Sequence, residues 1–159
     1  MPAFTLVTEA LSPLGRREAA SLAARGKDLV LLGEERASLE DLASELRVLH
    51  DRDVRTFAVD LGEPGATEQV LGWLRDRGLL LDGAVCVRCW DPRDLRAEPL
   101  ERGLAALEEA LSQTLRAQGG GFVSRVRGSS LPRQSSAVPL VSERKRKETD
   151  RGHADPTSR

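Results

Sequence analysis

Three residue types are missing from this sequence of 159 residues: it contains no Tyr, no Asn and no Ile. Any reaction that uses a phenol or an Asn side chain therefore lacks its functional group. The two cysteines, Cys86 and Cys89, are too few for a disulfide scaffold, which fits a reducing compartment. No stretch approaches the roughly 18 consecutive apolar residues of a membrane-spanning helix, and no signal sequence is evident. We therefore expect a cytoplasmic protein with no membrane contact.

Charge is distributed unevenly along the chain, although the net charge is only -1. Residues 1–121 contain 15 Lys and Arg against 21 Asp and Glu, whereas residues 122–159 contain nine against four. After residue 126 the apolar periodicity ends, so little apolar surface offsets the entropy of ordering the chain. We therefore predict one domain over residues 1–130 and a basic, disordered tail over residues 131–159.

The tail contains the basic run Arg144-Lys145-Arg146-Lys147, which resembles a short nucleic-acid-binding or localisation patch. No aromatic residue accompanies this run to stack on bases, and similar runs occur in solvated tails without function. A solvated tail is therefore the preferred interpretation, and we do not expect a nucleic-acid partner.

Five short apolar runs alternate with helical patterns, the order of elements that gives a parallel sheet with helices on both faces. The runs lack strict alternation of apolar and polar residues, as expected for strands covered on both sides. The predicted strands are Ala3 to Val7, Asp28 to Leu32, Val54 to Val59, Leu81 to Val87 and Phe122 to Val126. The sequence thus predicts an α/β domain with three layers.

Glycine and proline mark the ends of two of the helices between these strands. The first helix is predicted from about Leu14 to Arg25, and Gly26 ends it. The third has Pro64 in its first turn, where the missing N–H has no partner in any case, and it ends at Gly78.

Leucine spacing defines the other two helices. The second begins at Ser38, whose hydroxyl can cap free backbone N–H groups, and its predicted buried stripe is Leu39, Leu42, Leu46 and Leu49. The fourth stops at the glycines that begin at Gly119, and its stripe is Leu100, Leu104, Leu107, Leu111 and Leu115.

The first part of the chain resembles the short-chain dehydrogenases/reductases. The matching segments are Thr5-Leu6-Val7-Thr8, then Gly15 at the start of a helix, then Ala24-Arg25-Gly26-Lys27-Asp28-Leu29-Val30-Leu31-Leu32. Asp60-Leu61 is similar to the pair that family members place near the adenine. The resemblance covers residues 3–126 and implies a Rossmann-like sheet of five strands in the order 3-2-1-4-5. It also implies a truncated chain that stops before the elements that complete the family domain.

The turn after the first strand binds the dinucleotide in that family, where it reads Thr-Gly-x-x-x-Gly-x-Gly. Here it reads Thr8-Glu9-Ala10-Leu11-Ser12-Pro13-Leu14-Gly15, and only one of the three glycines remains. Glu9 places a carboxylate beside the expected phosphates, and Pro13 removes a donor. The resemblance therefore implies at most weak binding of NAD or NADP, through residual cofactor-binding residues: Thr8, Ser12, Gly15, Glu34, Asp60 and Leu61.

Glu34 and Glu35 leave the choice between NAD and NADP open. Either carboxylate can accept a hydrogen bond from a ribose diol, as an acid does at this position in NAD-binding relatives. The alternative, which we prefer, is that both carboxylates belong to a solvated lead-in to the next helix.

Catalysis in the family depends on Asn, Ser, Tyr and Lys, with Tyr as the proton donor or acceptor. Lys145 and Lys147 have no Tyr four residues before them, where the family Tyr would stand. Ser129 or Ser130 is either an equivalent of the family Ser or part of a turn. We therefore assign no catalytic residue.

Cys86-x-x-Cys89 follows the fourth strand, at the edge where open α/β domains bind ligands, and this spacing can bring two sulfurs together. A redox pair or half of a metal site is one interpretation. The only histidines are His50, at a helix end, and His153, in the tail, so we assign no metal site. Buried or half-buried thiols without redox function are the preferred alternative.

The leading functional hypothesis is a pseudoenzyme that acts as a binding or regulatory module, because hydride transfer needs both a bound cofactor and a proton donor. The alternatives are an NAD(P)-dependent oxidoreductase acting on a carbonyl or alcohol, a thiol redox module, and a decayed copy without selected function. In the family the fourth and fifth helices form the dimer interface. The helix from Leu100 to Leu115 is therefore expected either to pair with itself or an intact dehydrogenase, or only to cover the sheet.

Overall fold

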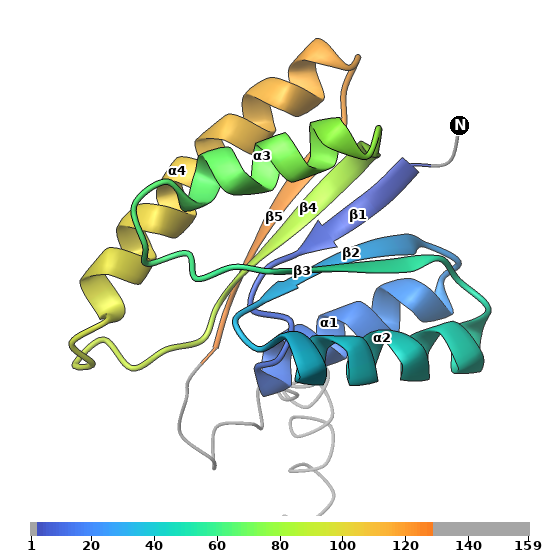
Figure 1. The fold of residues 1–159 in the computed structure, drawn as a ribbon, viewed down its shortest axis with the longest axis horizontal. Helices are drawn as coiled ribbons and strands as arrows, with labels where there is room; N and C mark the ends of the chain where they lie inside the picture. The colour runs from blue at the N-terminus through green and yellow to red at the C-terminus, as the bar shows by residue number, and fades with distance from the viewer. Residues whose placement is uncertain (1–2, 129–159) are drawn as a thin grey trace, which may run out of the picture.

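Parallel strands and helices alternate throughout the computed structural model, which describes residues 3–128. The strands are β1 (Ala3–Val7), β2 (Asp28–Gly33), β3 (Val54–Ala58), β4 (Leu80–Arg88) and β5 (Phe122–Arg127). The helices are α1 (Pro13–Ala24), α2 (Arg36–His50), α3 (Ala66–Asp76) and α4 (Ala97–Ala117). The strands form one parallel sheet in the order β3-β2-β1-β4-β5, which confirms the predicted Rossmann-like topology (Figure 1).

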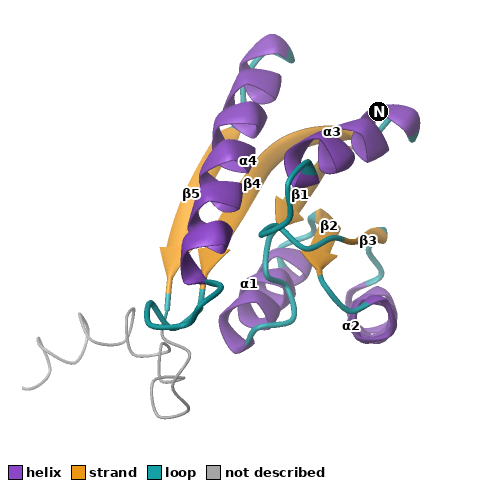
Figure 2. Cartoon of the chain, turned by 60° about the vertical axis from the view of Figure 1, so that its left-hand side comes forward, coloured by secondary structure: helices purple, strands orange, loops and turns teal. Residues whose placement is uncertain are grey.

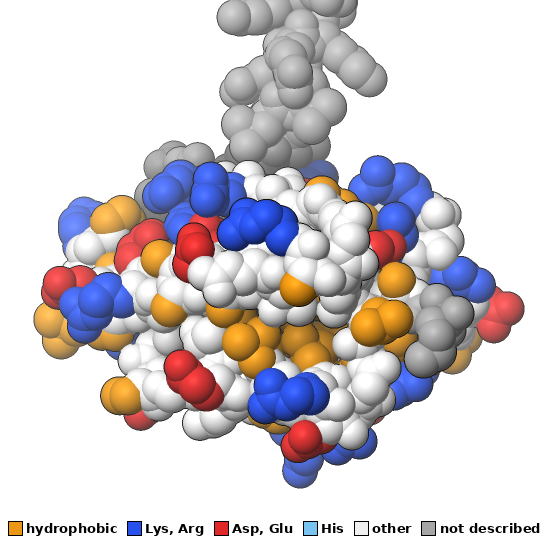
Figure 3. Space-filling view, turned by 90° about the horizontal axis from the view of Figure 1, so that it is seen from above, with side chains coloured by type: hydrophobic (Ala, Val, Ile, Leu, Met, Phe, Trp, Pro, Cys, Tyr) orange, Lys and Arg blue, Asp and Glu red, His pale blue; other side chains and the backbone are white. Residues whose placement is uncertain are grey.

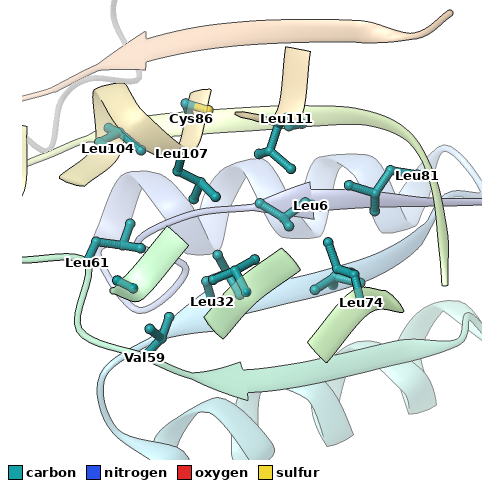
Figure 4. Close-up of a cluster of buried hydrophobic side chains, with 14 of the residues drawn as sticks. Leu6, Leu32, Val59, Leu61, Leu74, Leu81, Cys86, Leu104, Leu107 and Leu111 are labelled. Carbon is teal, nitrogen blue, oxygen red and sulfur yellow. The ribbon is translucent and has the colours of Figure 1, made fainter. Parts of the chain in front are cut away.

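The sheet lies between two layers of helices, with α1 and α2 on one face and α3 and α4 on the other (Figures 1 and 2). Successive strand residues point to opposite faces. Leu6 and Leu32 belong to the apolar cluster under α3 and α4, shown in Figure 4, whereas Val7 and Leu31 belong to the cluster under α1 and α2. This burial on both faces explains why the strand sequences show no alternation.

The leucine stripe of α4 covers the sheet. Its five leucines are at most 7% exposed: Leu100, Leu104, Leu107, Leu111 and Leu115. Burying one such side chain contributes roughly 2 kcal/mol, so the stripe is a major source of the packing that holds α4 on the sheet. The stripe therefore packs into the chain's own core, and pairing of this helix with a partner stays a prediction.

The ends of α1 and α3 follow the sequence prediction. Gly26 and Gly78 have left-handed backbones, with φ of 88° and 65°, directly after the last turns of these helices. A Cβ atom raises the energy of this left-handed conformation. Glycine has no Cβ, so it ends both helices with little conformational strain.

Three details of the helix predictions are wrong. Helix α2 begins at Arg36 rather than Ser38, and the Ser38 hydroxyl donates to the Glu35 carboxylate instead of capping the backbone. Leu49 is 65% exposed, because it lies in the last turn of α2, where the helix ends at the left-handed Asp51. Pro64 precedes α3, since the chain first makes a turn closed by the hydrogen bond from the Ala66 N–H to the Glu63 carbonyl.

Charged side chains of both signs are mixed over the face seen in Figure 3, around a central area of exposed apolar side chains. Within residues 3–128 no helix is long and apolar enough to cross a bilayer. The structure therefore contains no counterpart of a membrane-spanning helix in its described part.

Several sequence predictions concern residues that lie outside the described range. These are the tail over residues 131–159, the boundary at residue 130 and the positions Ser129, Ser130, Lys145, Lys147 and His153.

Candidate functional site

The carboxyl ends of β1, β2 and β3 bring three turns together at one edge of the sheet, where open α/β domains bind ligands. Thr8, at the end of β1, is fully buried. Its Oγ1 accepts a hydrogen bond from the Val87 N–H at 2.8 Å, and its own N–H donates to the Val85 carbonyl at 3.1 Å. Thr8 therefore joins β1 to β4.

The turn from Glu9 to Gly15 is closed by its own hydrogen bonds. Glu9 has a left-handed backbone with φ of 48°, which costs a non-glycine residue roughly 1–2 kcal/mol. The Glu9 carbonyl accepts the Ser12 N–H at 3.1 Å and the Ser12 hydroxyl at 2.8 Å. A Cβ on Gly15 would lie 1.9 Å from that carbonyl oxygen, so only glycine fits there. Gly15 is thus required for packing this turn against α1.

The amino terminus of α1 has its first backbone donors engaged within the chain. Pro13 has no N–H. The Gly15 N–H donates to Ser12 Oγ at 2.9 Å, and the Arg16 N–H donates to the Ser12 carbonyl at 2.9 Å. Helix termini attract phosphate through such donors, so an anion placed here would have to displace Ser12.

Arg96, the residue before α4, connects the ends of β2 and β3. Its Nη2 lies 3.1 Å from the Glu34 carboxylate and 2.5 Å from the Asp60 carboxylate. Asp60 also accepts the Gly62 N–H at 2.9 Å. Both carboxylates that the sequence proposed for a nucleoside are therefore engaged by a cation of the same chain.

The Glu9 carboxyl is half-buried beside these ion pairs. Burial raises the pKa of Glu9 above its usual value, the nearby Glu34 and Asp60 carboxylates raise it further, and only Arg96 lowers it. One guanidinium thus lies among three acidic side chains, two of which pair with it. A further anionic group would meet repulsion at this edge.

The side chain of Leu61 belongs to the core. Its side chain is 4% exposed and lies among the leucines of the cluster in Figure 4. Its carbonyl oxygen lies so close to α4 that a Cβ on Gly103 would come within 1.7 Å of it. Of the residues proposed from the sequence, the structure therefore gives Leu61 a packing role.

Comparisons with known proteins agree with this fold, although no family model matches the chain. A 7β-hydroxysteroid dehydrogenase of Clostridium sardiniense is 31% identical over 71 residues, which are 45% of this chain and 27% of that protein. A short-chain dehydrogenase of Sphingobium yanoikuyae, solved with NADPH, has a TM-score of 0.66 at 24% identity, over 79% of this chain and 53% of that chain. An alcohol dehydrogenase of Thermococcus sibiricus, solved with 5-hydroxy-NADP, has a TM-score of 0.64 at 21% identity, over 77% of this chain and 57% of that chain.

The chain has the fold of the short-chain dehydrogenases/reductases. The resemblance predicted from the sequence is thereby confirmed. The chain spans about half the length of these solved relatives.

A dinucleotide does not fit the first turn of this short-chain dehydrogenase fold. The diphosphate needs free N–H donors at the start of α1, but Ser12 engages the Gly15 N–H and Pro13 has none. The Glu9 carboxyl lies in the same turn, where a diphosphate would add negative charge to an acidic cluster. At the nucleoside end, Arg96 already pairs with Glu34 and Asp60.

Cys86 and Cys89 lie on opposite faces of the sheet, so their spacing does not bring the two sulfurs together. Cys86 is buried and Cys89 is half-buried, as the preferred interpretation expected. Cys86 belongs to the cluster under α4, whereas Cys89 packs against the cluster under α1. Side chains three positions apart in an extended segment point in opposite directions. Burial, followed by the charge of Glu108, raises the pKa of Cys86 to about 12. Among residues 3–128 no three His, Cys, Asp or Glu side chains gather as a metal site would require.

Sequence reasoning missed a cleft of about 690 Å³ at the carboxyl ends of β4 and β5. Trp90, Arg93 and Arg127 are among the side chains that line it, and none of the six proposed cofactor-binding residues does. Arg88 at this cleft donates to Glu108 at 2.7 Å and to Glu101 at 3.2 Å. No local pattern signals these pairs, since each joins a strand to a helix that follows later in the sequence.

Proposed function

We propose that this chain is a short-chain-dehydrogenase-like binding or regulatory module that does not transfer hydride on its own. The observation that carries the proposal is the position of Ser12, which donates to the Glu9 carbonyl and accepts the Gly15 N–H. Ser12 Oγ thus accepts a backbone N–H that an anion would otherwise bind at the start of α1. The 159 residues also supply neither the Tyr nor the Asn of the family reaction.

Arg96 supports the same conclusion from the nucleoside end of the site. Its guanidinium side chain is 46% exposed and pairs with Glu34 and Asp60, so a ribose diol would have to compete with an ion pair for its acceptors. Such exposed pairs are individually weak, about 0–1 kcal/mol, and they add to the closed turn without replacing it.

Thermal unfolding with about 1 mM NAD, NADH, NADP or NADPH tests the proposal. A ligand bound only by the folded state with a Kd of about 10 µM would stabilise the chain by about 2.7 kcal/mol. Such a stabilisation raises the melting temperature by several degrees. We expect no shift beyond the scatter of repeated melts. The Sphingobium yanoikuyae relative, solved with NADPH, is the positive control for the same assay.

The second candidate is an NAD(P)-dependent oxidoreductase that acts on a carbonyl or alcohol. It is favoured by the NADPH of the Sphingobium yanoikuyae structure and by the sequence similarity to a hydroxysteroid dehydrogenase. It predicts a clear melting shift with one dinucleotide, and oxidation of the reduced cofactor when a carbonyl compound is added. Either result with the purified chain would replace the first proposal by the second.

Association with a partner remains part of the proposal. Because the leucines of α4 are buried, a second copy or an intact dehydrogenase would have to contact the exposed side of this helix, at Arg102, Ala105 and Glu109. Light scattering during gel filtration tests self-association, since a species at the chain mass of 17.3 kDa alone would exclude a stable homodimer.

The cytoplasmic location also stays a prediction.

A further inference from the structure

Strand β3 forms one edge of the sheet, between α2 on one face and α3 on the other (Figures 1 and 2). The Asp53 carbonyl accepts the Leu29 N–H, and the Val59 N–H donates to the Gly33 carbonyl, so both residues turn their backbone groups toward β2. The direction alternates along a strand, and the backbone groups of positions 54, 56 and 58 therefore point outward.

The outward backbone groups are only partly engaged. Arg47 Nη2 donates a hydrogen bond to the Val54 carbonyl oxygen at 2.6 Å. The backbone N–H and carbonyl groups of Thr56 and Ala58 form no hydrogen bond on the outer side with any residue in the described part of the chain. Two consecutive outward positions of β3 can therefore accept an added strand.

A cleft of about 640 Å³ follows this edge and is strongly basic. Four arginines and one acid line it, in an otherwise acidic domain: Arg36, Glu40 and Arg47 from α2, Arg55 from β3 and Arg77 directly after α3. Two of the arginines form ion pairs: Arg47 Nη1 lies 3.6 Å from Glu40 Oε1, and Arg55 Nε lies 2.7 Å from Asp53 Oδ1.

Two of these cations remain available to a ligand. Within residues 3–128, Arg36 and Arg77 pair with no carboxylate. Arg36 is the first residue of α2 and Arg77 directly follows α3, the two helices that flank β3, and both arginines are exposed. One free positive charge is thus offered on each side of the edge strand.

We propose that an acidic, extended peptide segment binds here as an added strand beside β3. Its backbone would pair with the outward groups of Thr56 and Ala58, which is the usual mode of strand addition to a sheet edge. Side chains alternate between the two faces of a strand, so carboxylates on opposite sides of the peptide would meet Arg36 and Arg77.

The aromatic side chains of the cleft favour a peptide over a nucleic acid. Phe57 and Trp73 stack on each other with their ring centroids 5.0 Å apart, and the Arg77 guanidinium lies 5.5 Å from the Trp73 ring. A nucleic-acid base needs an aromatic face to stack on, and it would have to displace one of these neighbours. The cleft lies away from the Glu9 turn, so the inference does not depend on whether a dinucleotide binds.

The test uses fluorescence anisotropy at low ionic strength, with a capped, labelled peptide in which pairs of glutamates alternate with pairs of valines. Neighbouring glutamates point to opposite faces of a strand, so this peptide presents carboxylates on both sides. We expect saturable binding to the full chain, and no binding of the analogue with lysine in place of glutamate. The double variant Arg36→Glu/Arg77→Glu is expected to weaken binding at least about tenfold. Arg75→Glu is the matched control, because Arg75 is an exposed residue of α3 outside the cleft, and it should change the affinity less than about twofold.

A second variant tests the backbone contact separately from charge. Ala58→Pro removes an outward N–H without removing a side-chain hydrogen bond, and proline is tolerated at such edge positions because the hydrogen bonds to the neighbouring strand are kept. We expect Ala58→Pro to weaken the peptide about tenfold while the chain still unfolds cooperatively. Hydrogen exchange gives the same information without a substitution, since the peptide should slow exchange of the Thr56 and Ala58 amides.

Three results would overturn the proposal. One is the absence of peptide binding to the wild-type chain, and another is binding that the double arginine variant leaves unchanged. The third is an oligothymidylate that binds more tightly than the peptide and loses affinity in the arginine variant. None of these results bears on dinucleotide binding, which the melting experiment reports separately.

Discussion

Arg96 and Glu34 are 62 positions apart in the sequence, yet Nη2 of the arginine lies 3.1 Å from the carboxylate of the glutamate. This contact holds the residue before α4 across the ends of β2 and β3, where Asp60 also pairs with Arg96. The edge of the sheet that binds ligands in other α/β domains is thereby closed from two sides, by Ser12 at the first turn and by Arg96 at the second and third strands.

Arg96→Gln should raise the pKa of the Glu9 carboxyl further, because Arg96 is the group that lowers it in the wild-type chain. The expected loss of stability is small, at most about 1 kcal/mol, since the ion pairs are exposed. Carbon NMR of the Glu9 side chain during a pH titration measures the effect. Arg102→Gln, whose partner is the exposed Glu98, is the control and should leave the Glu9 titration unchanged.

Glu9→Gln should make the chain more stable at neutral pH and have little effect in acid. The folded-state pKa of Glu9 is raised above the ordinary 4.5, so its favourable contribution is complete below that value and is lost as the pH rises through the folded-state pKa. Denaturant unfolding at about pH 4 and pH 7 measures the two cases. A difference between wild type and variant that is equally large at both pH values would contradict this account of Glu9.

Gly103→Ala should destabilise the chain by about 1–3 kcal/mol. The added Cβ would lie 1.7 Å from the Leu61 carbonyl oxygen, so α4 or the loop after β3 must move. Gly72→Ala in α3 is the matched control, because its nearest neighbour would be Arg75 Nη2 at 3.7 Å, and alanine favours a helix by up to about 1 kcal/mol. Opposite signs for the two substitutions are the expected result of chemical denaturation, and equal signs would argue against the close contact at Gly103.

Glu108→Gln should cost about 3 kcal/mol at neutral pH, because it leaves the guanidinium of Arg88, whose side chain is only 11% exposed, without its buried partner. Burial alone would raise the pKa of Glu108, but the hydrogen bonds from Arg88 and Arg125 lower it below the ordinary 4.5. The contribution of Glu108 is therefore present above that value and is lost as the pH falls through the lowered pKa. Unfolding free energies of wild type and variant should converge in strong acid, and a constant difference would contradict the ion-pair role.

The strands and the α4 helix could be predicted from the sequence because their signals are local. The apolar runs mark β1 to β5 to within about one residue, and the leucine spacing from Leu100 to Leu115 matches the period of a helix covering the sheet. Helix starts were less reliable, since Ser38 resembles a cap but its hydroxyl finds the Glu35 carboxylate first.

The candidate site was predicted only in part, because its decisive contacts join residues distant in sequence. Nothing near Arg96 indicates Glu34 or Asp60 as its partners, and nothing near Leu61 indicates that it faces the core. The preferred interpretation of Cys86 and Cys89 as buried and half-buried thiols agrees with the structure. They lie apart because the chain stays extended past Val87, and three steps along an extended chain reverse the side-chain direction.

Titration of the purified chain with NADPH, followed by the fluorescence of the reduced nicotinamide, tests the central claim most directly. The wild-type chain should show no saturable change up to about 1 mM. The variant Glu9→Gly/Ser12→Gly/Pro13→Gly/Arg96→Gln, which removes the side chain that engages the Gly15 N–H and frees Glu34 and Asp60, should bind at least about tenfold more tightly. Saturation of the wild-type chain with a Kd below about 100 µM, or an equal affinity of wild type and quadruple variant, would contradict the closed site.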